Sequence, residues 1–189
     1  MKTIGLIGAP ASGKDTVAEF FVSNKGFKKF AFADKIKEGF YEESGFSEKE
    51  FKEARGTDKE LVIRNGLWAY SSKICKINGN DYFVKLVIEK VLEYNNLTII
   101  TDIRTNIELK YLFNIDAQII LILRDYKEEL KNKFLPGTKI MLRDVIEFPI
   151  FWNTYGNVSE THYALEDFYK EIQGDTIMDP DSLPGNYSK

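Results

Sequence analysis

A glycine-rich segment near the N-terminus constrains the fold of this chain more than any other feature. Residues 8–16 read Gly-Ala-Pro-Ala-Ser-Gly-Lys-Asp-Thr, directly after a short apolar run at residues 4–7 and at the start of an amphipathic helix. An apolar strand, a glycine loop and a helix in this order are the context of a phosphate-binding loop. The alternative is a glycine-rich turn that matches the motif by chance. The nucleotide-binding residues predicted by the motif are Gly8, Ala11, Ser12, Gly13, Lys14, Asp15 and Thr16.

The chemistry of this loop depends on its backbone and on one lysine. Successive N–H groups and the positive end of the helix dipole attract phosphate oxygens, and Lys14 supplies a mobile charge for the β- and γ-phosphates. The motif usually has Ser or Thr after the lysine as a magnesium ligand, but this chain has Asp15 followed by Thr16. A carboxylate could hold Mg²⁺ directly or through water.

Length and composition predict one enzyme-sized domain. The chain has 189 residues, of which 43% are hydrophobic, enough for one core with room for a substrate-covering insertion. A net charge of −3 argues against binding nucleic acid by bulk electrostatics. A single cysteine excludes a disulfide framework, and the chain begins with a strand rather than a charged leader. The longest aliphatic run, at 119–123, is too short to span a bilayer. We therefore expect a soluble, cytoplasmic protein with no membrane partner.

Hydrophobic periodicity predicts alternating strands and helices along most of the chain. We expect residues 44–57 to form a mobile excursion and the helix at 58–77 to be loosened at Gly66. The predicted strands are 4–7, 27–32, 97–102, 117–123 and 175–178, and the predicted helices are 16–24, 34–41, 58–77, 81–94, 105–113 and 163–172.

Charged residues follow two of the predicted strands. In an open α/β sheet, the carboxyl ends of the strands face the ligand crevice. Asp102 is therefore a candidate for a second carboxylate, after Asp15, that helps to hold Mg²⁺. The alternative is that Asp102 caps the helix at 105–113. Arg104 could bind a substrate phosphate or form an ion pair with Glu108. Arg124 is a second candidate for binding the transferred phosphate, although an arginine at a strand end is often only structural.

Several short segments together carry a resemblance to a known family. They read Gly-x-x-x-Ser-Gly-Lys-Asp-Thr at 8–16, Phe-Ala-x-x-Ile-Lys at 32–37, Asp-Tyr-Phe-Val-Lys at 81–85 and Asp-x-Arg-x-x-x-Glu at 102–108, with a helix at 64–69. In this combination the chain resembles the phage-type deoxynucleoside monophosphate kinases. The Lys-Asp-Thr form of the loop is a feature of that group.

The resemblance implies a three-layer α/β/α P-loop kinase fold with a central parallel sheet, a helical acceptor-binding insertion and a lid. A single kinase domain would span residues 1–189, with its core at 1–40, 96–125 and 174–179, the insertion at 41–95 and the lid region at 125–160. ATP would be the phosphoryl donor and Mg²⁺ the cofactor, with Asp15 and Asp102 on the metal side. The implied catalytic residues are Lys14, Arg104, Arg124 and Arg143. The implied acceptor-binding residues are Lys37, Arg64, Trp68, Lys85 and Arg104.

The C-terminal part departs from the family pattern. Residues 157–160 read Asn-Val-Ser-Glu where the family has a His-x-Ser-Glu-like element. Arg143 could be a lid arginine or an exposed charge. The aromatic segment at 148–155 could stack on a base, although such spacing is more often packing or an interface. The only histidine, His162, is expected at the surface.

These features lead to a functional hypothesis with two alternatives. A monophosphate acceptor is already anionic, so its phosphorylation needs positioning and cations rather than a strong base. We expect a kinase that converts ATP and a deoxynucleoside monophosphate (dNMP) into ADP and the corresponding diphosphate. One alternative is a related kinase for a phosphorylated metabolite or a hydroxymethyl pyrimidine nucleotide. The other is a nucleotide-binding ATPase or switch, although such proteins commonly have a glutamate after the strand-end acid, where this chain has Ile103. The sequence leaves a homodimer open.

Overall fold

A five-stranded parallel sheet forms the centre of the molecule in the computed structural model. The structure describes residues 2–124, 137–141, 145, 147–153 and 157–174. Within these, the strands follow the order β2-β3-β1-β4-β5, and every neighbouring pair is parallel. The strands are β1 (Thr3–Gly8), β2 (Lys28–Phe30), β3 (Thr98–Ile100), β4 (Gln118–Leu123) and β5 (Ile150–Trp152).

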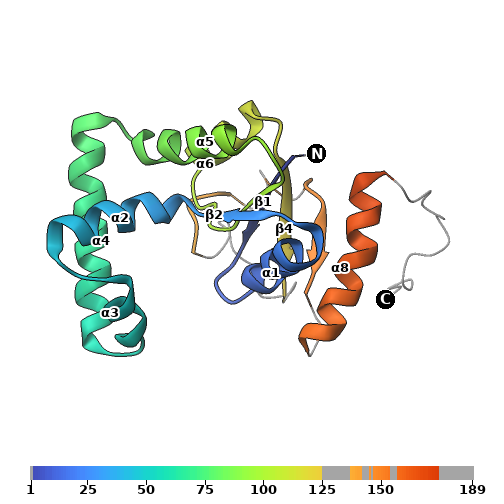
Figure 1. Cartoon of the computed structure of the whole chain (residues 1–189), viewed down its shortest axis with the longest axis horizontal. Coiled ribbons are helices and arrows are strands. Elements are labelled where there is room, and N and C mark those ends of the chain that lie inside the picture. The colour runs from blue at the N-terminus through green and yellow to red at the C-terminus, as the bar shows by residue number, and fades with distance from the viewer. Residues whose placement is uncertain (1, 125–136, 142–144, 146, 154–156, 175–189) are drawn as a thin grey trace.

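Helices cover both faces of this sheet (Figure 1). On one face, α1 (Lys14–Lys25) and α8 (Val158–Gln173) share a hydrophobic core with one set of strand side chains, including Leu6 and Ile120. On the other face, α5 (Tyr82–Tyr94) and α6 (Asn106–Asn114) pack against the alternate set, including Ile7 and Leu121. Because both faces are covered, β1 and β4 are apolar along almost their whole length. The structure confirms the predicted three-layer α/β/α architecture with a parallel sheet.

Three helices form an arm that projects beyond the sheet (Figure 1). They are α2 (Phe32–Ser44), α3 (Glu48–Glu53) and α4 (Asp58–Asn78). The arm has its own small hydrophobic cluster, in which Phe40, Ala54 and Ile63 are buried. It contains most of the residues expected to form the acceptor-binding insertion.

Two expectations about the arm are wrong. Residues 48–53 form helix α3 instead of an excursion, because Ser47 and Glu50 make a reciprocal capping box. Helix α4 runs unbroken through Gly66. A Cβ at Gly66 would lie 2.7 Å from Cζ of Phe40, so the glycine serves close packing against α2.

The C-terminal part also differs from expectation. Residues 150–152, expected within the lid region, form strand β5, because alongside β4 their backbone groups find hydrogen-bond partners. His162, expected at the surface, is half-buried, with its ring against Phe20. The expected strand at 175–178 lies outside the described residues. Within the part of the chain that is described, no helix is long and apolar enough to cross a bilayer.

Candidate functional site

The glycine segment forms a tight loop between β1 and α1. Gly8 ends β1, and a Cβ there would lie 2.5 Å from the carbonyl oxygen of Ile122, so only glycine permits this approach to β4. Gly13 precedes α1 with a φ of 96°, a conformation that favours glycine, and Ala11 also has a positive φ of 61°. The strand, loop and helix predicted from the sequence are therefore present.

The Lys14 side chain folds back over this loop. Its ammonium group donates hydrogen bonds to the carbonyl oxygens of Gly8 at 2.8 Å and Ala9 at 2.5 Å, and lies 3.5 Å from the Ser12 hydroxyl. Because Lys14 is the first residue of α1, its charge adds to the positive end of the helix dipole. The loop thus combines backbone N–H groups, a helix N-terminus and a cation, which suits it to bind phosphate.

Asp15 lies exposed in the first turn of α1, beside the lysine. Its Oδ1 accepts a hydrogen bond of 2.7 Å from Nζ of Lys29 on β2. This bond, together with the charges of Lys29, Lys14 and Arg55, lowers the pKa of Asp15, so the group is a carboxylate at neutral pH.

Asp102 caps a helix, but not the helix that directly follows it in the chain. Its two oxygens accept hydrogen bonds from the backbone N–H groups of Phe32 at 2.7 Å and Ala33 at 2.8 Å, at the start of α2. The alternative that Asp102 caps the following helix is wrong, because Thr105 caps α6. Burial raises the pKa of Asp102, while the two N–H bonds and the charge of Arg104 oppose the rise. Asp102 thus joins the end of β3 to the root of the arm.

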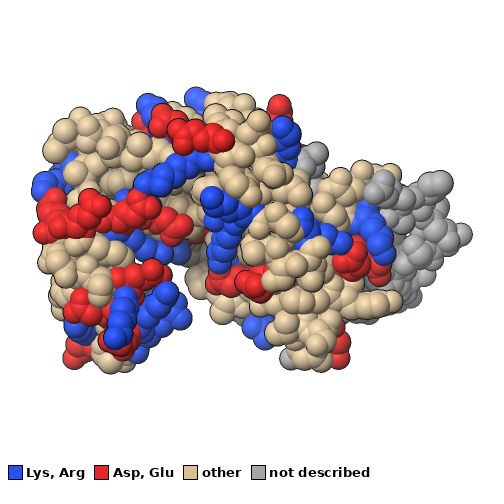
Figure 2. Space-filling view, viewed as in Figure 1, with Lys and Arg blue, Asp and Glu red and all other residues tan. Residues whose placement is uncertain are grey.

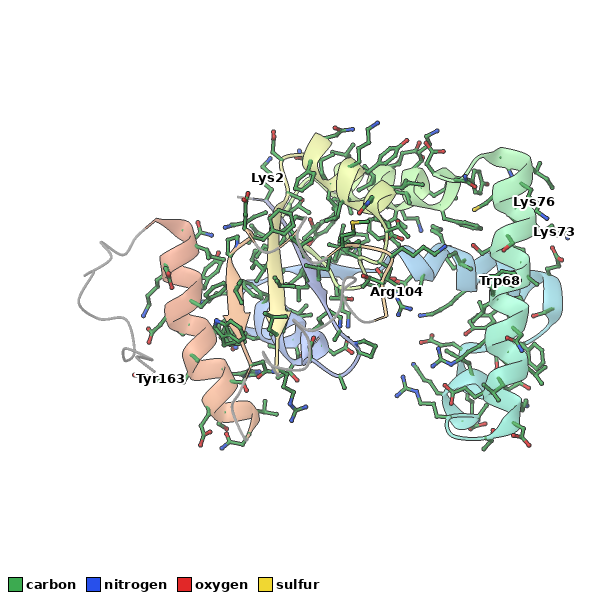
Figure 3. The ribbon with its side chains drawn as sticks, turned by 180° about the vertical axis from the view of Figure 1, so that it is seen from behind. Lys2, Trp68, Lys73, Lys76, Arg104 and Tyr163 are labelled. Carbon is green, nitrogen blue, oxygen red and sulfur yellow. The ribbon has the colours of Figure 1, made fainter. Side chains whose placement is uncertain are left out.

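Arg104 lies between the sheet and the arm (Figure 3). The alternative ion pair with Glu108 is absent among the described residues. The Glu108 carboxylate instead accepts the backbone N–H groups of Arg104 at 2.6 Å and Thr105 at 2.8 Å. These two bonds complete the start of α6, and the exposed Arg104 side chain takes no part in them. Burial raises the pKa of Glu108 against the effect of these N–H bonds.

The second strand-end arginine lies next to the loop. Nη1 of Arg124, just after β4, donates to the carbonyl oxygen of Ala11 at 3.3 Å. Arg124 is therefore close to the place where phosphate would bind. Arg143 and the last two positions of the aromatic segment at 148–155 lie outside the described residues.

The arm carries further cations, and the space-filling surface shows a hollow between the arm and the centre of the molecule (Figure 2). Arg64 on α4 forms an ion pair with Glu60 at 2.6 Å, and its guanidinium lies over the Phe51 ring. Lys37 on α2 lies 3.6 Å from Asp34.

Arg55 lies between α3 and α4 and affects the pKa of two carboxylates. Its charge lowers the pKa of Asp15 on α1 and also that of Glu60 on the arm. Arg55 is therefore a cation of the arm whose charge acts at Asp15, beside the loop.

Two of the predicted acceptor-binding residues are placed less favourably. The Trp68 side chain is 75% exposed on α4 (Figure 3). Lys85 forms an ion pair of 2.9 Å with Asp81, which also accepts a hydrogen bond from Tyr111. Lys85 is thus engaged at the contact between α5 and α6, and no contact among the described residues joins it to Arg64.

The residues near the loop fit a magnesium ion only as part of a nucleotide complex. Asp15 offers a carboxylate beside the phosphate site, whereas both oxygens of Asp102 already accept backbone hydrogen bonds. Within the described ranges, no group of three or more His, Cys, Asp or Glu could hold a metal. Magnesium commonly binds through one or two carboxylates together with nucleotide phosphates and water, which agrees with this arrangement.

Sequence reasoning missed two residues of the site. Arg55 lies at the end of α3, and the capping box at Ser47 could have located that helix. Asn153 follows β5 and donates from Nδ2 to the carbonyl oxygen of Ser12 at 2.9 Å. Its only local signal is the short apolar run at 150–152 before a polar residue.

No family model and no curated protein matches the chain. Dephospho-CoA kinase from Campylobacter jejuni is similar over 93% of this chain and 100% of its own, with 20% identity and a TM-score of 0.48. Shikimate kinase from Aquifex aeolicus is similar over 89% of this chain and 82% of its own, with 18% identity and a TM-score of 0.36. Both similarities are distant, with no more than 20% identity.

Proposed function

We propose that this chain is a P-loop kinase that transfers the γ-phosphate of ATP to a dNMP, forming ADP and a deoxynucleoside diphosphate. The observation that carries the proposal is the loop at residues 8–13, with the ammonium of Lys14 held over it at the start of α1. Such a loop binds the donor phosphates through backbone N–H groups.

The acceptor phosphate would bind on the opposite side of the hollow. Arg55 and Arg64 come from the arm, and Arg104 comes from the loop after β3. Guanidinium groups bind phosphate oxygens in a planar, two-pronged manner, which suits an acceptor that is itself a phosphate. We propose a deoxynucleotide as the acceptor because the sequence motifs resemble those of the phage-type deoxynucleoside monophosphate kinases.

Transfer between the two phosphates depends on position and charge. Lys14 and Arg124 would neutralise the phosphoryl group as it moves, because both lie at the loop. Magnesium, when bound with ATP beside Asp15, would supply further positive charge. The acceptor oxygen is already anionic, so no general base is required.

An ATPase or switch is a weaker explanation of the same loop. Such proteins commonly place a glutamate after the strand-end acid to activate water. Here that residue is Ile103, which is 2% exposed and lies in the hydrophobic core.

The test is ADP release, measured by a coupled assay with ATP against all common nucleoside and deoxynucleoside monophosphates. We expect release to depend on a dNMP, and Lys14→Ala to lower turnover by about 10²-fold or more, the usual effect of removing one preorganised transition-state contact. Lys28→Ala is the matched control, since Lys28 contacts Tyr94 and begins β2 at the other end of the sheet. ADP release without an acceptor would favour the ATPase, and near-normal turnover in folded Lys14→Ala would refute the loop assignment.

A further inference from the structure

Asn153 is a buried polar residue that joins the end of the sheet to the phosphate loop. It is 8% exposed, and its backbone N–H donates to the carbonyl oxygen of Leu123 at 2.8 Å, continuing the pairing of β5 with β4. Its side chain leaves the sheet and reaches Ser12, which lies 141 positions earlier in the chain.

Both ends of the Asn153 amide have partners. Nδ2 donates to the carbonyl oxygen of Ser12 at 2.9 Å. Oδ1 lies 3.3 Å from the hydroxyl of Thr161 on α8, which also lies 3.0 Å from the carbonyl oxygen of Asn157. Because the Ser12 carbonyl oxygen can only accept, the amide nitrogen is the end that faces it, and Oδ1 shares the single Thr161 hydroxyl proton with the Asn157 carbonyl oxygen.

The contact with Ser12 controls the direction of the next N–H group in the loop. In a trans peptide the C=O and the following N–H point in opposite directions, and the Ser12–Gly13 peptide is trans. A hydrogen bond that holds the Ser12 oxygen towards Asn153 therefore directs the Gly13 N–H away from β5.

The absence of a side chain at Gly13 permits this contact. A Cβ on Gly13 would lie 1.8 Å from Nδ2 of Asn153, so the amide packs directly against the glycine. The φ of 96° at Gly13 is likewise reached without strain only by glycine.

We propose that Asn153 is a positioning residue that holds the phosphate loop in its binding conformation. It acts through the Ser12–Gly13 peptide and does not touch the nucleotide. The inference rests on the proposed function to the extent that the loop must bind ATP.

The test compares ATP affinity, measured by calorimetry, with the free energy of unfolding in urea. We expect Asn153→Ala and Asn153→Asp to raise the Kd for ATP about tenfold, a change equivalent to one hydrogen bond in the loop. Inorganic triphosphate, which contacts only the phosphate site, should lose affinity by the same factor. Steady-state kinetics should show a raised KM for ATP with little change in the KM of the acceptor.

Asn157→Ala is the matched control. The Asn157 side chain caps α8 by accepting from the Glu160 N–H at 2.9 Å, so its loss destabilises the same helix without touching the loop. We expect this variant to lose stability and keep its ATP affinity. If Asn153→Ala does not fold, Thr161→Val removes the hydroxyl that contacts Oδ1 of Asn153, and it should weaken ATP binding about threefold, part of the effect of one hydrogen bond.

The outcomes separate this inference from the proposed function. Wild-type protein that binds ATP, together with Asn153 variants that bind it equally well, would overturn the positioning role alone. An equal loss of ATP affinity in Asn157→Ala would also overturn it, because the loss of affinity would then result from the lower stability of the protein and not from the contact with Ser12. Wild-type protein that fails to bind ATP would overturn both.

Discussion

Replacing Gly13 by alanine tests the packing of the loop most directly. Two costs are expected. An alanine at positive φ costs about 1–2 kcal/mol, and its Cβ, 1.8 Å from Nδ2 of Asn153, must displace the amide. The displaced amide leaves the carbonyl oxygen of Ser12 without its hydrogen bond, at about 1–3 kcal/mol. We therefore expect Gly13→Ala to lower the free energy of unfolding by about 2–5 kcal/mol.

Gly26→Ala provides the control for this measurement. Gly26 also has a positive φ, 72°, but a Cβ there would meet nothing within 4 Å. It should therefore cost only the backbone strain, about 1–2 kcal/mol. Both variants are unfolded in urea, and the double variant Gly13→Ala/Asn153→Ala should be more stable than additivity predicts. Equal losses at Gly13 and Gly26, or strict additivity in the double variant, would refute the contact.

Three further predictions concern the charged residues of the site. Asp15→Ala should raise the Mg²⁺ concentration needed for half-maximal turnover, and Asp15→Ser should recover part of the loss; identical magnesium curves would mean that Asp15 has no role on the metal side. Arg104→Ala should raise the KM of the acceptor and lower kcat, with little change in the KM of ATP. Arg104→Lys should recover only part of the lost activity, because an ammonium group lacks the planar, two-pronged geometry of a guanidinium. A change confined to the KM of ATP would instead assign Arg104 to the donor site. Burial raises the pKa of Asp102 above its ordinary value of 3.8, so the folded protein binds this proton more tightly than the unfolded chain. The free energy of unfolding of the wild type, measured in urea, should therefore fall relative to that of Asp102→Asn as the pH rises from about 3.8 through the raised pKa. A rise over the same pH range would show that the hydrogen bonds from α2 affect the pKa of Asp102 more than burial does.

The strand, loop and helix at the N-terminus could be predicted because their signal is local. Glycines, a lysine and the start of a helix lie within nine residues, and the apolar strand directly precedes them. The core strands could be found for a related reason, since β1 and β4 are buried on both faces and read as continuous apolar runs.

The parts that escaped prediction depend on contacts between distant segments. Asp102 could be placed at a strand end, but its helix partner begins at Phe32, 70 positions earlier. Strand β5 has only three residues, and its aromatic side chains are equally compatible with a loop. Helix α3 is a different case, because its Ser-x-x-Glu signal at 47–50 was present and the charged composition of the segment obscured it.

The bond between Asn153 and Ser12 also has a consequence for the protein during its synthesis. The complete glycine motif leaves the ribosome early, whereas its partner is made 141 residues later. Chains generally begin to fold as they are made, N-terminal segments first. A nascent chain that ends before β5 would therefore display the whole phosphate motif with the Ser12–Gly13 peptide unrestrained. If the loop binds ATP as proposed, tight binding would then begin only after β5 has left the ribosome and joined β4.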